Sequence, residues 1–198
     1  SHSLSAVPKF YVVKRRDSTG GWIVYSEYIG NTKILELHEA AASQTSNSSW
    51  NSTSPTSSVF TVYDANAVNN ASGTFVNYLF AEKKGFSRFG TFVGNGSANG
   101  PYVHCGFRPA YVMVKSVSTS QGWVVYDNKR DTHNPEENTF YINTSEAESD
   151  YVGFDFCANG FKHRSTGGSH NANGVEFIFL AFAEAPFCNS SGVACNAR

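Results

Sequence analysis

The chain has 198 residues, of which 16% are charged and 15% aromatic, and its formal net charge is −1. This balance excludes the broad basic surface that a nucleic-acid-binding protein needs. No stretch is apolar for long enough to cross a membrane as a helix, and the first residues lack a charged segment followed by an apolar signal-peptide core. We therefore expect neither nucleic acid nor membrane insertion.

Short aromatic and β-branched runs, separated by Gly, Ser, Thr and Asn, indicate an all-β protein. The strands expected in the first half are residues 10–13, 22–25, 59–63 and 75–80. Those expected in the second half are residues 111–114, 123–126, 151–156 and 177–182. Several of these runs are apolar at every position, which is typical of strands buried on both faces.

Between these strands, two stretches of the first half are ambiguous. Residues 34–42 are the only helix-like segment, and they could equally form a strand that ends in a turn. Residues 43–58 are rich in Ser, Thr and Asn and contain Trp50 and Pro55, so we expect a long exposed loop.

The second half repeats the first. Pro8–Lys14, Gly21–Tyr25, Asn70–Gly73 and Tyr78–Glu82 recur in the same order as Pro109–Lys115, Gly122–Tyr126, Asn171–Gly174 and Leu180–Glu184. Such duplication builds a large β-structure from one unit. We expect the matched Trp22 and Trp123 to anchor the two cores in equivalent buried positions.

The repeat predicts one duplicated β-sandwich domain, jelly-roll or lectin-like, over residues 1–184, with repeats of about 1–84 and 85–184 and a tail at 185–198. The segment Phe86–Gly96 leads into the second repeat and has no counterpart before the first. We therefore expect this chain to be the carboxy-terminal part of a longer polypeptide.

No catalytic, cofactor or metal site is expected from the sequence. The six histidines lack metal-ligand spacing, no nucleophile elbow is present, and the adjacent Glu136 and Glu137 should point opposite ways, into solvent. Cys188 and Cys195 are close enough in sequence to form a disulfide, but free thiols are equally compatible with the spacing.

Three long motifs lie at Phe80–Gly90 (FAEKKGFSRFG), Gly94–Pro101 (GNGSANGP) and Gly106–Lys115 (GFRPAYVMVK). The block from Asn70 to Lys115 that contains them resembles a duplicated module of structural proteins from tailed bacteriophages and prophages. The resemblance covers nearly the whole chain. It implies a virion location at the particle surface and transfers no catalytic residue.

On this resemblance we expect a non-enzymatic tail-fibre or tail-associated protein that contacts a host-surface glycan or protein receptor. Its other partners would be virion proteins, including further copies of itself, most simply in a trimer. The alternatives are a capsid-surface fibre or decoration protein and, third, a polysaccharide-degrading enzyme.

Receptor contacts are expected on loops that differ between the two repeats. An exposed indole can stack on a sugar, and Asn, His and Arg can hydrogen-bond to its hydroxyls. The residues predicted on this basis are Trp50, His133, Asn134, His163, Arg164 and His170.

Overall fold

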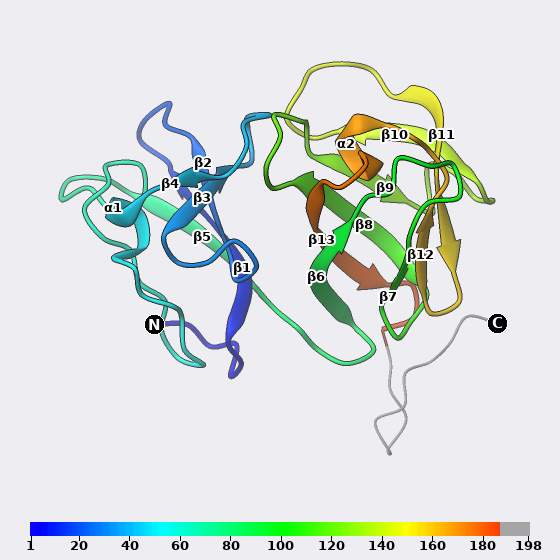
Figure 1. Cartoon of the computed structure of the whole chain (residues 1–198). Coiled ribbons are helices and arrows are strands. Elements are labelled where there is room, and N and C mark those ends of the chain that lie inside the picture. Colours follow the sequence, from blue (N-terminus) through cyan, green and yellow to red (C-terminus); the bar gives the residue numbers. More distant parts are fainter. Residues whose placement is uncertain (187–198) are drawn as a thin grey trace. The chain divides into compact units, whose positions relative to one another are not determined.

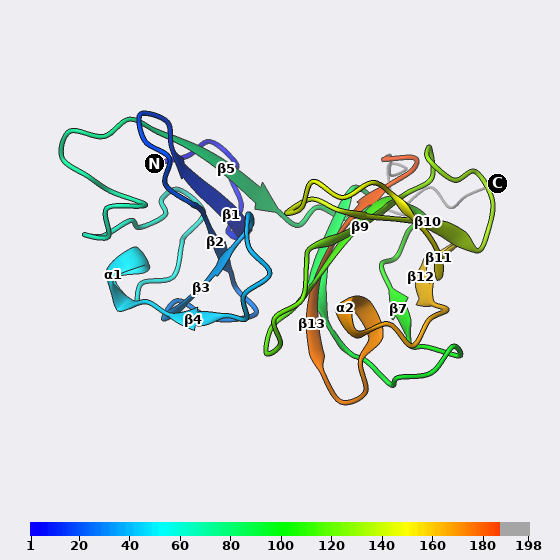
Figure 2. The same cartoon turned by 90° about the horizontal axis from the view of Figure 1, so that it is seen from above.

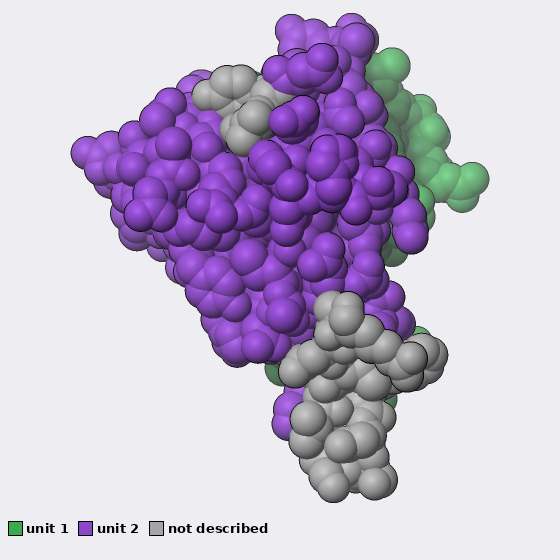
Figure 3. Space-filling model, turned by 90° about the vertical axis from the view of Figure 1, so that its right-hand side faces the viewer, with its two compact units in different colours: residues 1–82 green, residues 83–198 purple. Residues whose placement is uncertain are grey.

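The computed structural model describes residues 1–186, and it divides the chain into two compact units, Ser1–Glu82 (unit 1) and a second that begins at Lys83 (unit 2) (Figures 1 and 3). Each unit has its own sheet and its own core, and the division falls close to the boundary between the repeats. Most of the tail and both Cys188 and Cys195 lie outside the described residues.

Unit 1 contains one five-stranded antiparallel sheet in the order β4-β3-β2-β1-β5. Its elements are β1 (Pro8–Arg15), β2 (Trp22–Ser26), β3 (Lys33–Glu36), β4 (Gln44–Thr45), α1 (Asn47–Trp50) and β5 (Phe75–Ala81). The segment Ile34–Ala42 is thus a strand followed by a turn. Residues 59–63, predicted as a strand, are irregular; Phe60 and Val62 nevertheless pack against the core.

Unit 2 contains an eight-stranded sheet in the order β6-β13-β8-β9-β10-β11-β12-β7, which curls round its core (Figure 2). Its elements are β6 (Ser87–Val93), β7 (Tyr102–His104), β8 (Pro109–Ser116), β9 (Val124–Asp127), β10 (Glu136–Tyr141), β11 (Ser149–Cys157), β12 (Gly160–His163), α2 (Gly168–Asn171) and β13 (Glu176–Ala183). The prediction of an all-β fold built from two similar halves is confirmed. Among the described residues, no helix is long and apolar enough to span a membrane.

The duplication extends to the pairing of individual residues. In the hairpins β1–β2 and β8–β9, repeat-equivalent residues face each other: Val12 faces Val24, and Met113 faces Val125. The last strand of each repeat then returns to pair with the first, β5 with β1 and β13 with β8, again at equivalent positions. Both of these pairings shift register beside the proline that opens the first strand. One three-stranded unit is therefore used twice.

Equivalent side chains also close the turn of each hairpin. Lys14 Nζ donates a hydrogen bond to the Gly20 carbonyl at 2.6 Å, and Lys115 Nζ donates one to the Gln121 carbonyl at 2.7 Å. Each lysine thus ties the end of the first strand to the residues just before the tryptophan that follows the turn. Burial lowers the pKa of Lys115 to about 8.

The two tryptophans occupy equivalent places but are not equally buried. Trp22 faces Lys14 across the hairpin, and the Lys115 ammonium lies 6.0 Å from the centre of the Trp123 ring. Trp123 is fully buried whereas Trp22 is partly exposed. The expectation that both are buried is therefore wrong for Trp22, which stacks on the exposed Tyr78 of β5.

A short helix covers the core of each unit with one ring. In unit 1, Trp50 of α1 packs edge-on against Tyr25, with ring centres 5.9 Å apart. In unit 2, His170 of α2 packs edge-on against Tyr126, the repeat equivalent of Tyr25, at 6.1 Å. The two helices come from unrelated sequence but close the same face of the duplicated sheet.

We predict that Trp123→Ala lowers the free energy of unfolding by about 3–5 kcal/mol, because it leaves a cavity in a closely packed core. Trp22→Ala should cost less, since part of that ring already contacts water. Urea unfolding followed by far-UV circular dichroism checks both variants. Equal losses for the two would contradict the difference in burial.

Candidate functional site

An open pocket of about 480 Å³ lies on unit 2, lined by Asn134, Pro135, Asp155 and Arg164. We call it the Arg164 pocket. It joins two segments that are distant in sequence: the loop between β9 and β10, and the outer side of β11 and β12. Asn134 and Arg164 were both predicted from sequence, and the fold brings them together.

Strand alternation places the charged residues of the pocket on its surface. Phe154 and Phe156 of β11 point into the core, so Asp155 between them points outward. On β12, His163 points inward, and Arg164 follows it on the outer side, within reach of Asp155.

Asp155 and Arg164 form an ion pair through Arg164 Nε and Asp155 Oδ2. The Asp155 side chain is nearly buried, whereas the Arg164 side chain is 41% exposed. Among the described residues this is the sole hydrogen-bonding partner of the guanidinium, so its terminal nitrogens can donate to a ligand. The Asp155 carboxylate therefore fixes the position of the Arg164 guanidinium.

Asn134 is bonded to β11 and does not offer its amide to a ligand. Its side-chain nitrogen donates to the Phe156 carbonyl at 2.8 Å, and its side-chain oxygen accepts from the Phe156 amide at 3.0 Å. Both polar atoms of the amide are thus used within the protein. The bond to Pro135 is cis, and the apolar proline ring lines the pocket beside it.

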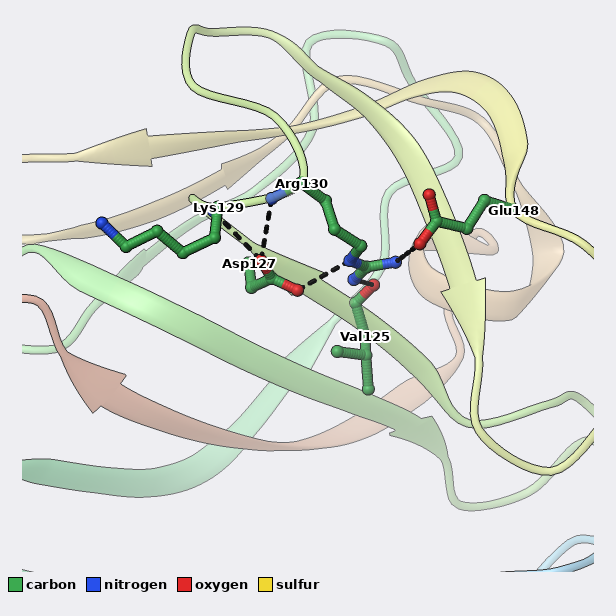
Figure 4. A network of polar contacts seen from close by, with 5 residues as sticks. All are labelled: Val125, Asp127, Lys129, Arg130 and Glu148. Carbon is green, nitrogen blue, oxygen red and sulfur yellow. Dashed lines mark hydrogen bonds and ion pairs between the residues drawn. The ribbon is translucent and has the colours of Figure 1, made fainter.

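The loop that carries Asn134 is anchored at its start by Arg130 (Figure 4). Arg130 Nε contacts Asp127 Oδ2 at 2.7 Å, and its terminal nitrogens reach Glu148 Oε1 at 3.2 Å and the Val125 carbonyl at 3.0 Å. The second Asp127 oxygen accepts the backbone amides of Lys129 and Arg130. These contacts hold the turn after β9 in one conformation.

Asp131 anchors the end of the same loop. One of its carboxylate oxygens accepts the Glu137 amide at 2.8 Å, and the other lies 3.1 Å from His133 Nδ1. The His133 side chain is 72% exposed and directly precedes Asn134. Of the predicted contact residues, His133 and Arg164 are therefore accessible to a ligand.

Trp50, His163 and His170 are buried, so the expectation that they lie on exposed loops is wrong. Trp50 packs against Tyr11 and Tyr25, and its ring nitrogen donates to the Lys33 carbonyl at 3.0 Å. The residues around Trp50 are polar, but Trp50 itself covers the apolar face of the unit 1 sheet that carries Tyr11 and Tyr25. Receptor contact itself stays a prediction.

The two histidines belong to the aromatic core of unit 2. Their rings stack with centres 5.8 Å apart, and His163 also stacks on Phe92 at 4.8 Å. Neither ring nitrogen of His163 has a hydrogen-bond partner among the described residues. Burial lowers the pKa of His163 well below its usual 6.5, with smaller effects of His170 and Lys162, and lowers the pKa of His170 to about 4.

Glu136, expected in solvent, is only 2% exposed. It faces Phe154 across the β10–β11 pairing, close to the loop that forms the pocket wall. Burial raises the pKa of its carboxyl to about 8, and the charges of Asp131 and Asp127 act in the same direction. Its neighbour Glu137 is exposed, as adjacent positions of a strand require.

We predict that acid destabilises unit 2 through His163 and His170. Below pH 6.5 these histidines bind protons in the unfolded chain but not in the folded chain. The free energy of unfolding therefore falls as the pH falls towards 4. For His170 alone this amounts to about 3 kcal/mol. His163→Phe should reduce the fall in melting temperature between pH 6.5 and 4 without abolishing it, because His170 remains. His104→Gln, on the surface, should leave the fall unchanged.

We also predict that Glu136→Gln stabilises the protein at high pH. A raised carboxyl pKa contributes stability that is fully present below pH 4.5 and is lost as the pH rises towards 8. The glutamine variant should therefore melt at a higher temperature than the wild type at pH 8 but not at pH 4. Glu137→Gln is the matched control, and an equal gain from it would refute a role for burial.

Comparison with known proteins supplies a family. No curated protein and no solved structure matches the chain. A family model described as a domain of unknown function, DUF7483, matches residues 1–186, which includes both repeats and every residue of the Arg164 pocket. The chain therefore belongs to the DUF7483 family.

Proposed function

We propose that the chain is a structural protein of a tailed-bacteriophage virion, part of a tail fibre or tail-associated protein, and that it binds a host-surface receptor through the Arg164 pocket. The virion assignment rests on the resemblance of the motifs in Asn70–Lys115. The binding assignment rests on the geometry of unit 2. One observation carries it: an accessible guanidinium is held by a nearly buried carboxylate at the edge of a pocket with fixed walls.

The chemistry of the pocket favours a glycan. Arg164 offers charged donors, and Pro135 gives an apolar surface against which a sugar ring can pack. The exposed ring of His133, which precedes Asn134 in the chain, offers a further polar contact outside the pocket lining. The anchors at Asp127, Asp131 and Asn134 hold these groups before a ligand arrives, which lowers the entropic cost of binding.

The pocket supports binding rather than cleavage of a polysaccharide. Glycoside hydrolysis canonically uses two carboxyl groups on either side of the bond that is cut. Of the four residues that line the pocket, Asp155 alone carries a carboxylate, and that carboxylate is paired with Arg164. This arrangement suits recognition by hydrogen bonds.

Adsorption of the purified chain to host cells tests the site. We expect Arg164→Ala to weaken adsorption at least tenfold, because the variant loses the charged donor at the pocket edge. Lys83→Ala, which removes one exposed positive charge of unit 2 outside the pocket lining, should bind like the wild type. Circular dichroism establishes that both variants fold.

Unchanged adsorption by Arg164→Ala would reject the receptor site and favour the decoration protein. Gold-labelled antibody against the chain, viewed on intact virions, distinguishes the two directly. Label at the tail agrees with the receptor-binding proposal, and label spread over the capsid contradicts it.

We further propose a homo-oligomer, most simply a trimer, since the resemblance is to fibre proteins, which are usually threefold. Multi-angle light scattering at micromolar concentration should give three times the mass of the chain. A monomeric mass would remove the fibre assignment but leave the pocket chemistry intact.

A further inference from the structure

The last strand of each repeat has a different neighbour on its outer side. In unit 2, β13 lies between β8 and β6, and pairs with both along its length. In unit 1, the equivalent strand β5 pairs with β1 and ends the sheet (Figure 1). In unit 2 the strand β6 thus lies outside β13, whereas in unit 1 no strand of the described residues lies outside β5.

Burial follows this difference. The residues Phe177–Ala181 of β13 are all buried beside β6. Their repeat equivalents in β5, Phe75–Leu79, include the exposed Asn77 and Tyr78, and Tyr78 is 48% exposed although it lies in the middle of the strand. An apolar strand with an open backbone edge is a template for pairing with another strand.

We propose that the edge of β5 over Phe75–Leu79 binds an extended peptide segment with the sequence pattern of β6, by antiparallel strand addition. Affinity would come from backbone hydrogen bonds, and specificity from alternate side chains of the added segment. Unit 2 displays the same arrangement already formed, with Phe89 opposite Leu180 and Gly90 opposite Phe179.

The pairing in unit 2 specifies the chemistry of the segment. In unit 2 a Cβ at Gly90 would lie 2.6 Å from the Phe179 ring, so β6 itself requires a small residue there, whereas the equivalent of Phe179 in β5 is Asn77. One position earlier, Phe89 is fully buried and meets Phe182 at 6.0 Å. In unit 1, the residue equivalent to Leu180 is Tyr78, so an aromatic side chain at the Phe89 position of the added segment would cover its exposed ring.

A synthetic peptide of residues 86–96 (FSRFGTFVGNG), added to the full chain, tests the proposal. Hydrogen exchange followed by NMR should show alternate amides of Phe75–Leu79 exchanging at least tenfold more slowly when peptide is in excess. The amides of β13, whose edge is already occupied, should not change.

Two modified peptides supply a control that leaves the protein untouched. One carries N-methyl groups on Arg88, Gly90 and Phe92, and the other on Phe89, Thr91 and Val93. Because the backbone amides of a strand point alternately to its two sides, one set should abolish the protection and the other should preserve it.

Three results would overturn the proposal: no protection with millimolar peptide, protection that both methylated peptides retain, or protection that appears with rising protein concentration alone. The last would identify a second copy of the chain as the occupant. None of these results bears on adsorption through the Arg164 pocket, so the two proposals fail separately.

Discussion

The constraint on which this structure depends is the return of each repeat's last strand to its first. β5 pairs with β1, and β13 pairs with β8, so about sixty residues are closed into a loop in each repeat. Between the paired strands the chain first adds the equivalent strand β2 or β9 to the sheet, and after that the two units differ. In unit 1 the rest is β3, β4, α1 and irregular chain, whereas in unit 2 it is β10, β11, β12 and α2. The same scaffold therefore supports two different enclosures.

Equivalent hydrogen bonds fix the two hairpins, some within the hairpin and some to residues further along the chain. Lys14 and Lys115 tie each hairpin to its own turn, within seven residues of chain. The Trp22 amide meets His38, and the Trp123 amide meets Asn143, an equivalent contact made by two different side chains. Geometry has thus been retained where residue identity has changed, which is what a scaffold under packing constraint shows.

The repeated three-stranded units could be predicted well from the sequence, whereas the segments that cover them could not. The strands of the three-stranded unit repeat in sequence, so pattern alone located them. Trp50 and His170 are in segments with no repeat and no periodicity, and their burial depends on a sheet face that only the folded chain presents. The irregular residues 59–63 failed for the same reason: their apolar side chains reach the core without forming a strand.

The candidate site shows the same division. Asn134 and Arg164 were found because their loops diverge between the repeats. Asp155 was missed because it lies within a predicted strand, although its place between Phe154 and Phe156 marks it as outward-facing. Glu136 could not be recognised as buried, since it differs from Glu137 in register alone, and register is set by pairing with β11.

The ring that caps each core has one further consequence. Trp50 cannot bind a proton, whereas His170 can. The equivalent residues Tyr25 and Tyr126 are therefore covered by chemically different rings. A chain that is symmetrical in its scaffold is thereby asymmetrical in its response to acid. As the medium is acidified, the melting temperature of the histidine-capped unit should fall relative to that of the tryptophan-capped unit.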